Sequence, residues 1–184
     1  MKIEDKHLVK TLLSVRANDV FYYENLQSRL SFRPKNCFCK CLIECNTPKA
    51  LLQTLRLLKN PNAHHKNFKQ APVKHEVLGN GSNIIIPDFY NGYMVKLGKN
   101  FKQIKKLKTD KNCVKVEVGA GTNLFVLHQY LKEKEIGGLE WAFGIPGSVG
   151  GAVIMNAGAF GKEFGSFVDK VKIIKNGKYV WTKN

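Results

Sequence analysis

The chain has no apolar segment that approaches the roughly 20 residues needed for a membrane-spanning helix. It also shows no apolar leader, because residues 1–6 already carry two acidic side chains and no secretory h-region follows them. Both absences argue against a transmembrane anchor and against secretion. We therefore expect a cytoplasmic protein that does not associate with a membrane.

Acidic residues are scarce: 14 aspartates and glutamates accompany 30 lysines and arginines, which gives a formal net charge of +16. Arginine is scarce as well, although specific recognition of phosphates and bases favours its planar guanidinium group. In the densest lysine run, residues 99–111, the apolar residues Phe101, Ile104 and Leu107 lie three positions apart. This spacing is typical of a solvated face over an apolar stripe. We interpret the charge as solvated surface and keep nucleic-acid binding as the weaker alternative.

The cysteines do not have the spacing of a common zinc site. Cys37, Cys39, Cys41 and Cys45 form a Cys-x-Cys-x-Cys-x3-Cys cluster, and the candidate second pair of ligands, the histidines at 64–65, is adjacent in sequence. Structural zinc sites instead use two pairs whose members are separated by two to four residues. Alternation places the first three cysteines on one side of a strand, where cysteine acts as a small buried hydrophobe. We predict a core strand, no disulfides and no metal site.

Local patterns predict a mixture of helices and strands. The clearest signal is Thr47 followed by Pro48, which are typical of a helix cap and a first helical position. Asn176 and Gly177 predict a type I′ hairpin turn. The other expected elements are helices at 6–16 and, capped by Thr122, at 122–134, strands at 39–45, 76–78, 84–86, 93–97, 114–118, 168–174 and 178–181, and an exposed loop at 60–72.

Glycine-rich segments are the most informative feature of the chain, because glycine reaches φ > 0 and lets a backbone approach other atoms closely. They lie at residues 79–83, 119–121 and 144–152, and the last leads into 155–159. A Rossmann fingerprint would open a helix, whereas residues 79–83 lie between two short apolar segments with strand character. No segment ends in the Gly-Lys-Ser or Gly-Lys-Thr of a P-loop. We expect a ligand cradle on a different nucleotide-binding fold.

The segments 79–86, 119–121 and 138–161, taken in order, resemble the UDP-N-acetylenolpyruvoylglucosamine reductases, also called UDP-N-acetylmuramate dehydrogenases. The resemblance covers roughly residues 45–182. It implies an α+β fold of the vanillyl-alcohol-oxidase-like (PCMH) type, in which FAD lies between two subdomains. We expect these subdomains at residues 1–90 and 91–184, with the second one incomplete and the third, substrate-binding domain absent.

The resemblance also implies a reaction. Enzymes of this family use NADPH to reduce the flavin and then reduce the enolpyruvyl group of a UDP-sugar in peptidoglycan synthesis, which serves cell-wall biogenesis, cell shape and cell division. Their proton donor, a serine or cysteine assisted by a glutamate, and a tyrosine–arginine pair are expected beyond Asn184. We therefore assign no catalytic residue in this chain and expect it to be inactive alone.

The matching positions imply the cofactor site. The N–H groups of Gly81, Ser82 and Asn83 and the Ser82 hydroxyl would hold the pyrophosphate of FAD. The turn before residue 150 would add anion binding at a helix start, with Ile145 and Ala152 beside the flavin. The residues implied for FAD binding are Gly79, Asn80, Gly81, Ser82, Asn83, Gly119, Gly121, Ile145, Pro146, Gly147, Ser148, Val149, Gly150, Gly151, Ala152, Asn156, Ala157 and Gly158.

One segment departs from the family pattern. Residues 31–36 lack the two glycines of the Thr-x-Phe-Lys-x-Gly-Gly segment often seen in the family, which affects the expected contacts to the adenosine side. Glu140 and His128 are interpreted as structural, because a single carboxylate or a helical histidine is weak evidence for catalysis. A non-catalytic flavin-binding module, or a decayed fragment of the enzyme, remains the alternative function.

Overall fold

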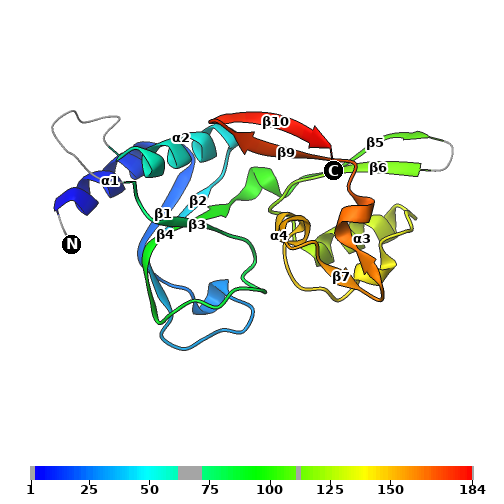
Figure 1. Cartoon of the computed structure of the whole chain (residues 1–184), viewed down its shortest axis with the longest axis horizontal. Coiled ribbons are helices and arrows are strands. Elements are labelled where there is room, and N and C mark those ends of the chain that lie inside the picture. The colour runs from blue at the N-terminus through cyan, green and yellow to red at the C-terminus, as the bar shows by residue number, and fades with distance from the viewer. Residues whose placement is uncertain (1–2, 62–71, 111–112, 184) are drawn as a thin grey trace.

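The computed structural model describes residues 3–61, 72–110 and 113–183. Figure 1 shows two halves side by side, the first built around a sheet with α1 and α2, the second around α3 and α4. Within the described ranges, no helix is both long and apolar enough to span a membrane. The expected pair His64 and His65, and most of the expected loop at 60–72, lie outside these ranges.

Helices and strands alternate irregularly along the chain, which confirms the α+β class. The α-helices are α1 (Ile3–Ser14), α2 (Pro48–Lys59), α3 (Leu124–Glu133) and α4 (Val149–Ile154). The strands are β1 (Asn18–Asn25), β2 (Phe38–Cys45), β3 (His75–Leu78), β4 (Phe89–Leu97), β5 (Ile104–Asp110), β6 (Cys113–Val118), β7 (Gly158–Ala159), β8 (Lys162–Glu163), β9 (Lys170–Lys175) and β10 (Lys178–Lys183). Short 3₁₀ helices occur at Gln27–Arg29, Lys99–Phe101, Glu140–Ala142 and Phe164–Phe167.

The sheet of the first half has the order β1-β2-β4-β3, with β1 antiparallel to β2 and both β2 and β3 parallel to β4. Its two faces bury different clusters of apolar side chains. The helix-covered face buries Leu8, Leu12, Ile43, Leu51, Leu58 and Val95. The other buries Leu26, Leu30, Cys37, Leu42, Leu78 and Met94. Because the segments that follow β1 and β3 cover this second face, both are fixed against the sheet.

The expected domain boundary at residue 90 falls inside β4. This strand pairs with β2 from Phe89 to Leu97 and with β3 from Tyr93 to Lys96. The first sheet therefore extends to Leu97, and the second half begins only after it. A division at residue 90 would separate β4 from pairing partners that lie up to about 50 positions earlier in the chain.

Cys39, Cys41 and Cys45 are buried in β2 and Cys37 is buried just before it, but contrary to the prediction they do not share one face. Cys39 belongs to the cluster on the second face of the sheet, whereas Cys41 belongs to the cluster under the helices. The register between β2 and β4 shifts between these two residues, so a bulge reverses the side-chain alternation. Burial also raises the pKa of the Cys39 and Cys41 thiols to about 12. Among the described residues, no group of three metal-ligating side chains gathers anywhere.

Two further local predictions are corrected. Residues 84–86 form no strand, because no neighbouring strand pairs with them; Ile84 and Ile86 pack on the sheet while Ile85 is 96% exposed. Helix α3 is capped by Asn123, whose side-chain oxygen accepts from Phe125 N at 2.8 Å. Thr122 is buried instead, and its carbonyl accepts from Val149 N.

The second half buries its own core between α3, α4 and the two nearby 3₁₀ helices. Its buried members are Leu124, Leu127, Leu131, Trp141, Ala142, Val149, Ala152 and Phe164. The lysine-rich residues after Lys99 form the strand β5, paired with β6, and Ile104 packs against this core. The helices α3 and α4 and the two 3₁₀ helices thus fix the position of the glycine-rich turn before α4.

The hairpin β9–β10 connects the two halves. Its turn residues Asn176 and Gly177 have φ of 51° and 70°, which confirms the predicted type I′ turn. At this end, Arg56 on α2 donates to Gly177 O at 3.2 Å and Tyr179 donates to Pro48 O at 3.0 Å. At the other end, Asp169 pairs with Lys115 of β6 at 2.9 Å. The hairpin crosses from α2 toward β5 and β6 in Figure 1.

The cap of α2 provides a test of the helix start that Thr47 and Pro48 predict. The Thr47 hydroxyl accepts from Ala50 N at 3.2 Å, so Thr47→Ala should lower the free energy of unfolding by about 1 kcal/mol in urea denaturation. Thr47→Ser keeps the oxygen and serves as the control. Equal losses for the two variants would contradict a role for the cap.

Neighbouring glycines of α4 provide a second test. A Cβ added at Gly150 would lie 2.9 Å from both Cβ and O of Ala120, whereas at Gly151 the nearest atom, Ser148 Oγ, would be 3.3 Å away. Gly150→Ala should therefore lower the melting temperature. Gly151→Ala should leave it unchanged or raise it, since alanine favours a helix by about 0.5–1 kcal/mol. Identical melting temperatures would show that Gly150 is not required for packing.

Candidate functional site

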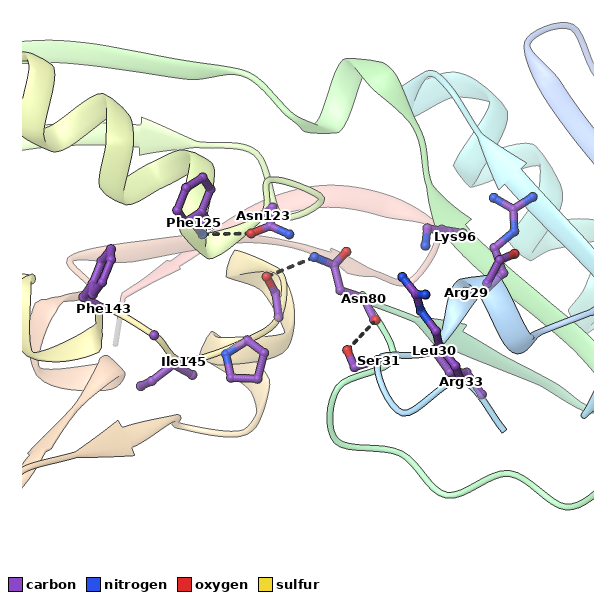
Figure 2. A pocket seen from close by; sticks show the side chains of 14 residues that line it. Arg29, Leu30, Ser31, Arg33, Asn80, Lys96, Asn123, Phe125, Phe143 and Ile145 are labelled. Carbon is purple, nitrogen blue, oxygen red and sulfur yellow. Dashed lines mark hydrogen bonds between the residues drawn. The ribbon is translucent and has the colours of Figure 1, made fainter. Parts of the chain in front are cut away.

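The first and third glycine-rich loops contact each other directly. Asn80 Nδ2 donates to Gly147 O at 3.0 Å, and Ser82 Oγ donates to Pro146 O at 3.0 Å. Figure 2 shows the bond between Asn80 and the backbone of the facing loop. Residues more than 60 positions apart are thus held together at the junction of the two halves.

The two loops can touch because Gly79 and Gly147 have no side chain. A Cβ on Gly79 would lie 2.9 Å from Ser148 Oγ, and one on Gly147 would lie 3.1 Å from Ser82 Oγ. Gly147 also has φ of 142°, a conformation that L side chains rarely adopt. Glycine is therefore required here because the two loops touch each other.

A cavity of about 610 Å³ opens beside this contact. It receives side chains from the first half and from the turn before α4. The lining residues are Ser28, Arg29, Leu30, Ser31, Arg33, Asn80, Lys96, Asn123, Phe125, Phe143, Gly144, Ile145, Pro146 and Gly147. Figure 2 shows Arg29, Arg33 and Lys96 on one side, Phe125 and Phe143 on the other, and the two asparagines between them.

The lining combines positive charge with exposed aromatic rings. Three cationic side chains line the cavity and no carboxylate does. Phe125 and Phe143 are 57% and 66% exposed, although large aromatic side chains are usually buried. The cavity can therefore accept an anionic group at one end and a planar ring at the other.

The first glycine loop leaves backbone donors free. Gly81, at φ of 65°, packs so tightly against Arg29 and Leu30 that a Cβ would lie 2.8 Å from Arg29 O, and its carbonyl accepts from Ser31 N at 3.0 Å. Within the described part of the chain, no acceptor is found for the N–H groups of Gly81, Ser82 and Asn83. These donors match the predicted pyrophosphate contacts, which stay a prediction. The Ser82 hydroxyl is already used between the loops.

The start of α4, in contrast, has few free donors. Val149 N donates to Thr122 O and Gly150 N to Ala120 O, both at 2.8 Å, while Gly151 N donates to Ser148 Oγ at 3.2 Å. Protein oxygens thus already accept from these three amides, and the expected anion binding at this turn and helix start stays a prediction. Val149 and Ala152 are buried in the core of the second half, so Ala152 does not face the cavity.

The remaining predicted positions also have structural partners. A Cβ on Gly119 would overlap the carbonyl of Phe101, and one on Gly121 would lie 3.2 Å from Leu97 Cβ. Asn156 donates to Glu163 at 2.7 Å and accepts from Gly165 N at 2.9 Å. Neither Ala157, which packs on the core, nor Gly158, which lies in β7, lines the cavity. Of the residues implied for FAD binding, the cavity lining includes Asn80, Ile145, Pro146 and Gly147.

Glu140 and His128 have the structural contacts expected of them. Both carboxylate oxygens of Glu140 accept from Gly138 N, at 2.9 and 2.8 Å. A hydrogen bond from the backbone N–H of Glu140 itself, and then those from Gly138, lower the pKa of this carboxyl group. The two ring nitrogens of His128 lie 2.7 Å from Leu124 O and 3.1 Å from Leu139 O. Both side chains therefore stabilise the turn that follows α3.

The sequence patterns missed the charged and aromatic lining: Ser28, Arg29, Ser31, Arg33, Lys96, Asn123, Phe125 and Phe143. The usable signal was the scarcity of arginine, since two of only four arginines line this cavity. The segment 31–36, which lacks the two glycines, still reaches left-handed conformations at Arg33 (φ 44°) and Asn36 (φ 55°). Asparagine tolerates this region better than most residues.

The comparisons with known proteins agree with this geometry. The FAD binding domain family matches residues 42–183. UDP-N-acetylenolpyruvoylglucosamine reductase from Thermotoga sp. (strain RQ2) is 42% identical over 106 residues, covering 58% of this chain and 34% of that protein. The enzyme of the same name from Clostridioides difficile (strain 630) is 31% identical over 157 residues, covering 85% of this chain and 46% of that protein. These findings confirm the resemblance predicted from the sequence.

A solved structure shows the same fold. The UDP-N-acetylenolpyruvylglucosamine reductase (MurB) from Thermus caldophilus superposes with a TM-score of 0.65 and 24% identity, over 90% of this chain and 52% of that one. This likeness fits the predicted PCMH-type architecture. The chain spans about a third to a half of the length of the curated relatives that it matches. Because the family match covers most of its residues, the chain belongs to the FAD binding domain family.

Proposed function

We propose that these residues form the FAD-binding part of an NADPH-dependent reductase that converts UDP-N-acetylenolpyruvoylglucosamine to UDP-N-acetylmuramate in peptidoglycan synthesis. The observation that carries the proposal is the cavity beside the contact between the two glycine loops, with three cationic side chains and no carboxylate in its lining. The names of the curated relatives support the reaction.

The cavity suits FAD in size and chemistry. Its volume of about 610 Å³ lies within the range of about 300–1,000 Å³ that is usual for ligand sites. Arg33, Lys96 and the free N–H groups of the first glycine loop would hold the diphosphate. Phe125 and Phe143 would contact a planar ring.

The chemistry supplied by bound FAD is hydride transfer from NADPH to the enolpyruvyl double bond of the UDP-sugar. In this account the described residues bind and orient the cofactor. The proton donor and the contacts to the UDP-sugar would come from sequence corresponding to the rest of the relatives' length. Hydride transfer needs reacting atoms within about 3–3.5 Å, so the 184 residues alone should turn over poorly.

Titration with FAD, followed by the change in flavin fluorescence, tests the proposal. We expect saturable binding of one FAD per chain and, with NADPH and the enolpyruvyl UDP-sugar added, an oxidation rate near background. Absence of FAD binding would contradict the proposed cofactor role. Full turnover by these residues alone would contradict the proposal that the proton donor and the contacts to the UDP-sugar come from other sequence.

Variants of two phenylalanines locate the bound ring. Phe143→Ala should weaken FAD binding several-fold, because an aromatic contact contributes about 0.5–1.5 kcal/mol. Phe89→Ala is the matched control, since Phe89 is 42% exposed and stacks on Tyr23 outside the cavity lining. An equal effect of the two substitutions would show that Phe143 does not contact the ligand.

A further inference from the structure

Lys96 occupies an unusual place for a lysine. It lies on β4, directly opposite Glu44 of β2 in the parallel register, and its side chain is half-buried where it lines the cavity. Yet no carboxylate among the described residues comes within ion-pair distance of its ammonium group. A partly desolvated cation without a close partner is costly, so an anion at this position would stabilise it.

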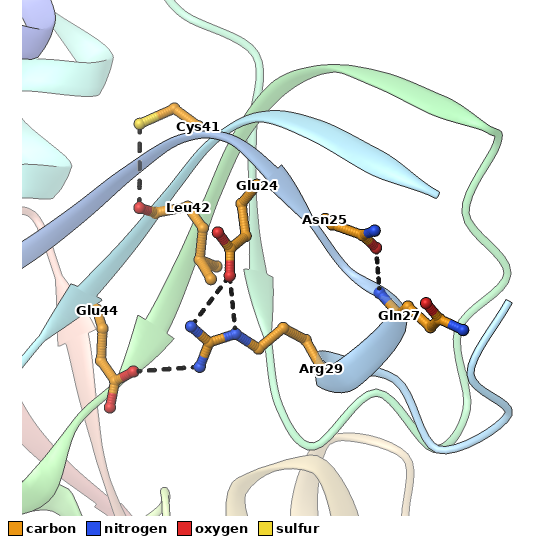
Figure 3. A network of polar contacts seen from close by, with 7 residues as sticks. All are labelled: Glu24, Asn25, Gln27, Arg29, Cys41, Leu42 and Glu44. Atoms are coloured by element: carbon orange, nitrogen blue, oxygen red, sulfur yellow. Dashed lines mark hydrogen bonds and ion pairs between the residues drawn. The ribbon is translucent and has the colours of Figure 1, made fainter. Parts of the chain in front are cut away.

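Glu44, the carboxylate opposite Lys96, and Glu24 on β1 are both engaged by Arg29. Glu24 Oε1 lies 3.1 Å from Arg29 Nη2 and also accepts from Nε at 3.1 Å, and Glu44 Oε2 lies 4.0 Å from Nη1. Figure 3 shows the guanidinium group held between these two side chains. It also lies over the ring of Phe21, 5.2 Å from the centroid. Arg29 is therefore both neutralised and fixed in orientation.

The charges that face Lys96 favour an external anion. Burial lowers the pKa of Lys96 first of all, and the positive charges of Arg29 and Lys102 lower it further, while Glu44 raises it. The single opposing carboxylate does not compensate for the loss of water. An anionic ligand would add the missing negative charge and would favour the protonated lysine.

We propose that Lys96 is the anion anchor of the cavity: its ammonium group binds the diphosphate of a dinucleotide, and Glu24 and Glu44 hold Arg29 beside it. This inference rests on the proposed function for the identity of the dinucleotide. It assigns different roles to Arg29 and Lys96, since Arg29 shapes the wall and Lys96, like Arg33 in the same lining, forms no ion pair with any residue that the structure describes and supplies positive charge to the cavity.

Calorimetric titration of the whole chain with ADP and AMP, at pH 8 and above, tests the anchor. ADP should bind more tightly than AMP, and Lys96→Met should weaken ADP binding about tenfold or more, because a hydrogen bond between charged groups is lost. Lys105→Met, which removes an exposed charge from β5, is the matched control and should change the affinity less than twofold. Lys96→Met should keep the melting temperature, because it removes a half-buried charge.

The pH dependence separates a charge contact from a packing effect. ADP affinity of the natural chain should fall as pH rises through the lowered pKa of Lys96, since the deprotonated amine no longer attracts the diphosphate. Lys96→Arg should keep binding and lose this alkaline fall, because a guanidinium group stays charged.

The outcomes distinguish the two proposals. If FAD and ADP bind equally well to the natural chain and to Lys96→Met, the anchor is overturned while the FAD-binding function stands. If ADP binding depends on Lys96 but FAD does not bind, the anchor stands and the proposed function fails. If the natural chain binds neither ADP nor FAD, both are overturned.

Discussion

The contact between the loops at residues 79–83 and 144–148 is the constraint on which the rest of the candidate site depends. The hydrogen bonds from Asn80 and Ser82 to the facing carbonyls close the junction of the two halves. Glycine at positions 79 and 147 makes this approach sterically possible. Because both loops are anchored on buried clusters, the cavity beside them has a defined shape. The hairpin β9–β10 stabilises the same arrangement, because Tyr179 donates to Pro48 O of α2 and Asp169 pairs with Lys115 of β6.

Several glycines of the glycine-rich segments are required by packing within the protein. Gly119 and Gly150 are required where the backbone packs against the carbonyls of Phe101 and Ala120, away from the cavity. The amides at the start of α4 already donate to protein oxygens. The cavity lining also draws on side chains of neighbouring elements, above all Lys96 and the aromatic rings. A glycine motif therefore predicts roughly where the ligand site lies, but it does not predict which residues contact the ligand.

Local signals predicted local structure well. Thr47 and Pro48 defined the start of α2, and Asn176 and Gly177 defined the hairpin turn, because each depends on backbone geometry within a few residues. The bulge between Cys39 and Cys41 and the missing strand at 84–86 could not be predicted, since both depend on which strands become neighbours. The same holds for the cavity: Arg29 follows β1 and Lys96 lies on β4, so both reach the lining only through the pairing of β1 with β2 and of β2 with β4.

The central claim is that FAD binds in the cavity beside the contact between the two loops and touches both halves. Amide hydrogen exchange, measured with and without FAD, tests it directly, because the N–H groups of Gly81, Ser82 and Asn83 have no acceptor within the described part of the chain. The account predicts slower exchange in two separate segments, one around residues 79–83 and one around residues 143–147. Protection confined to one half of the chain, or no protection in either loop at saturating FAD, would contradict it.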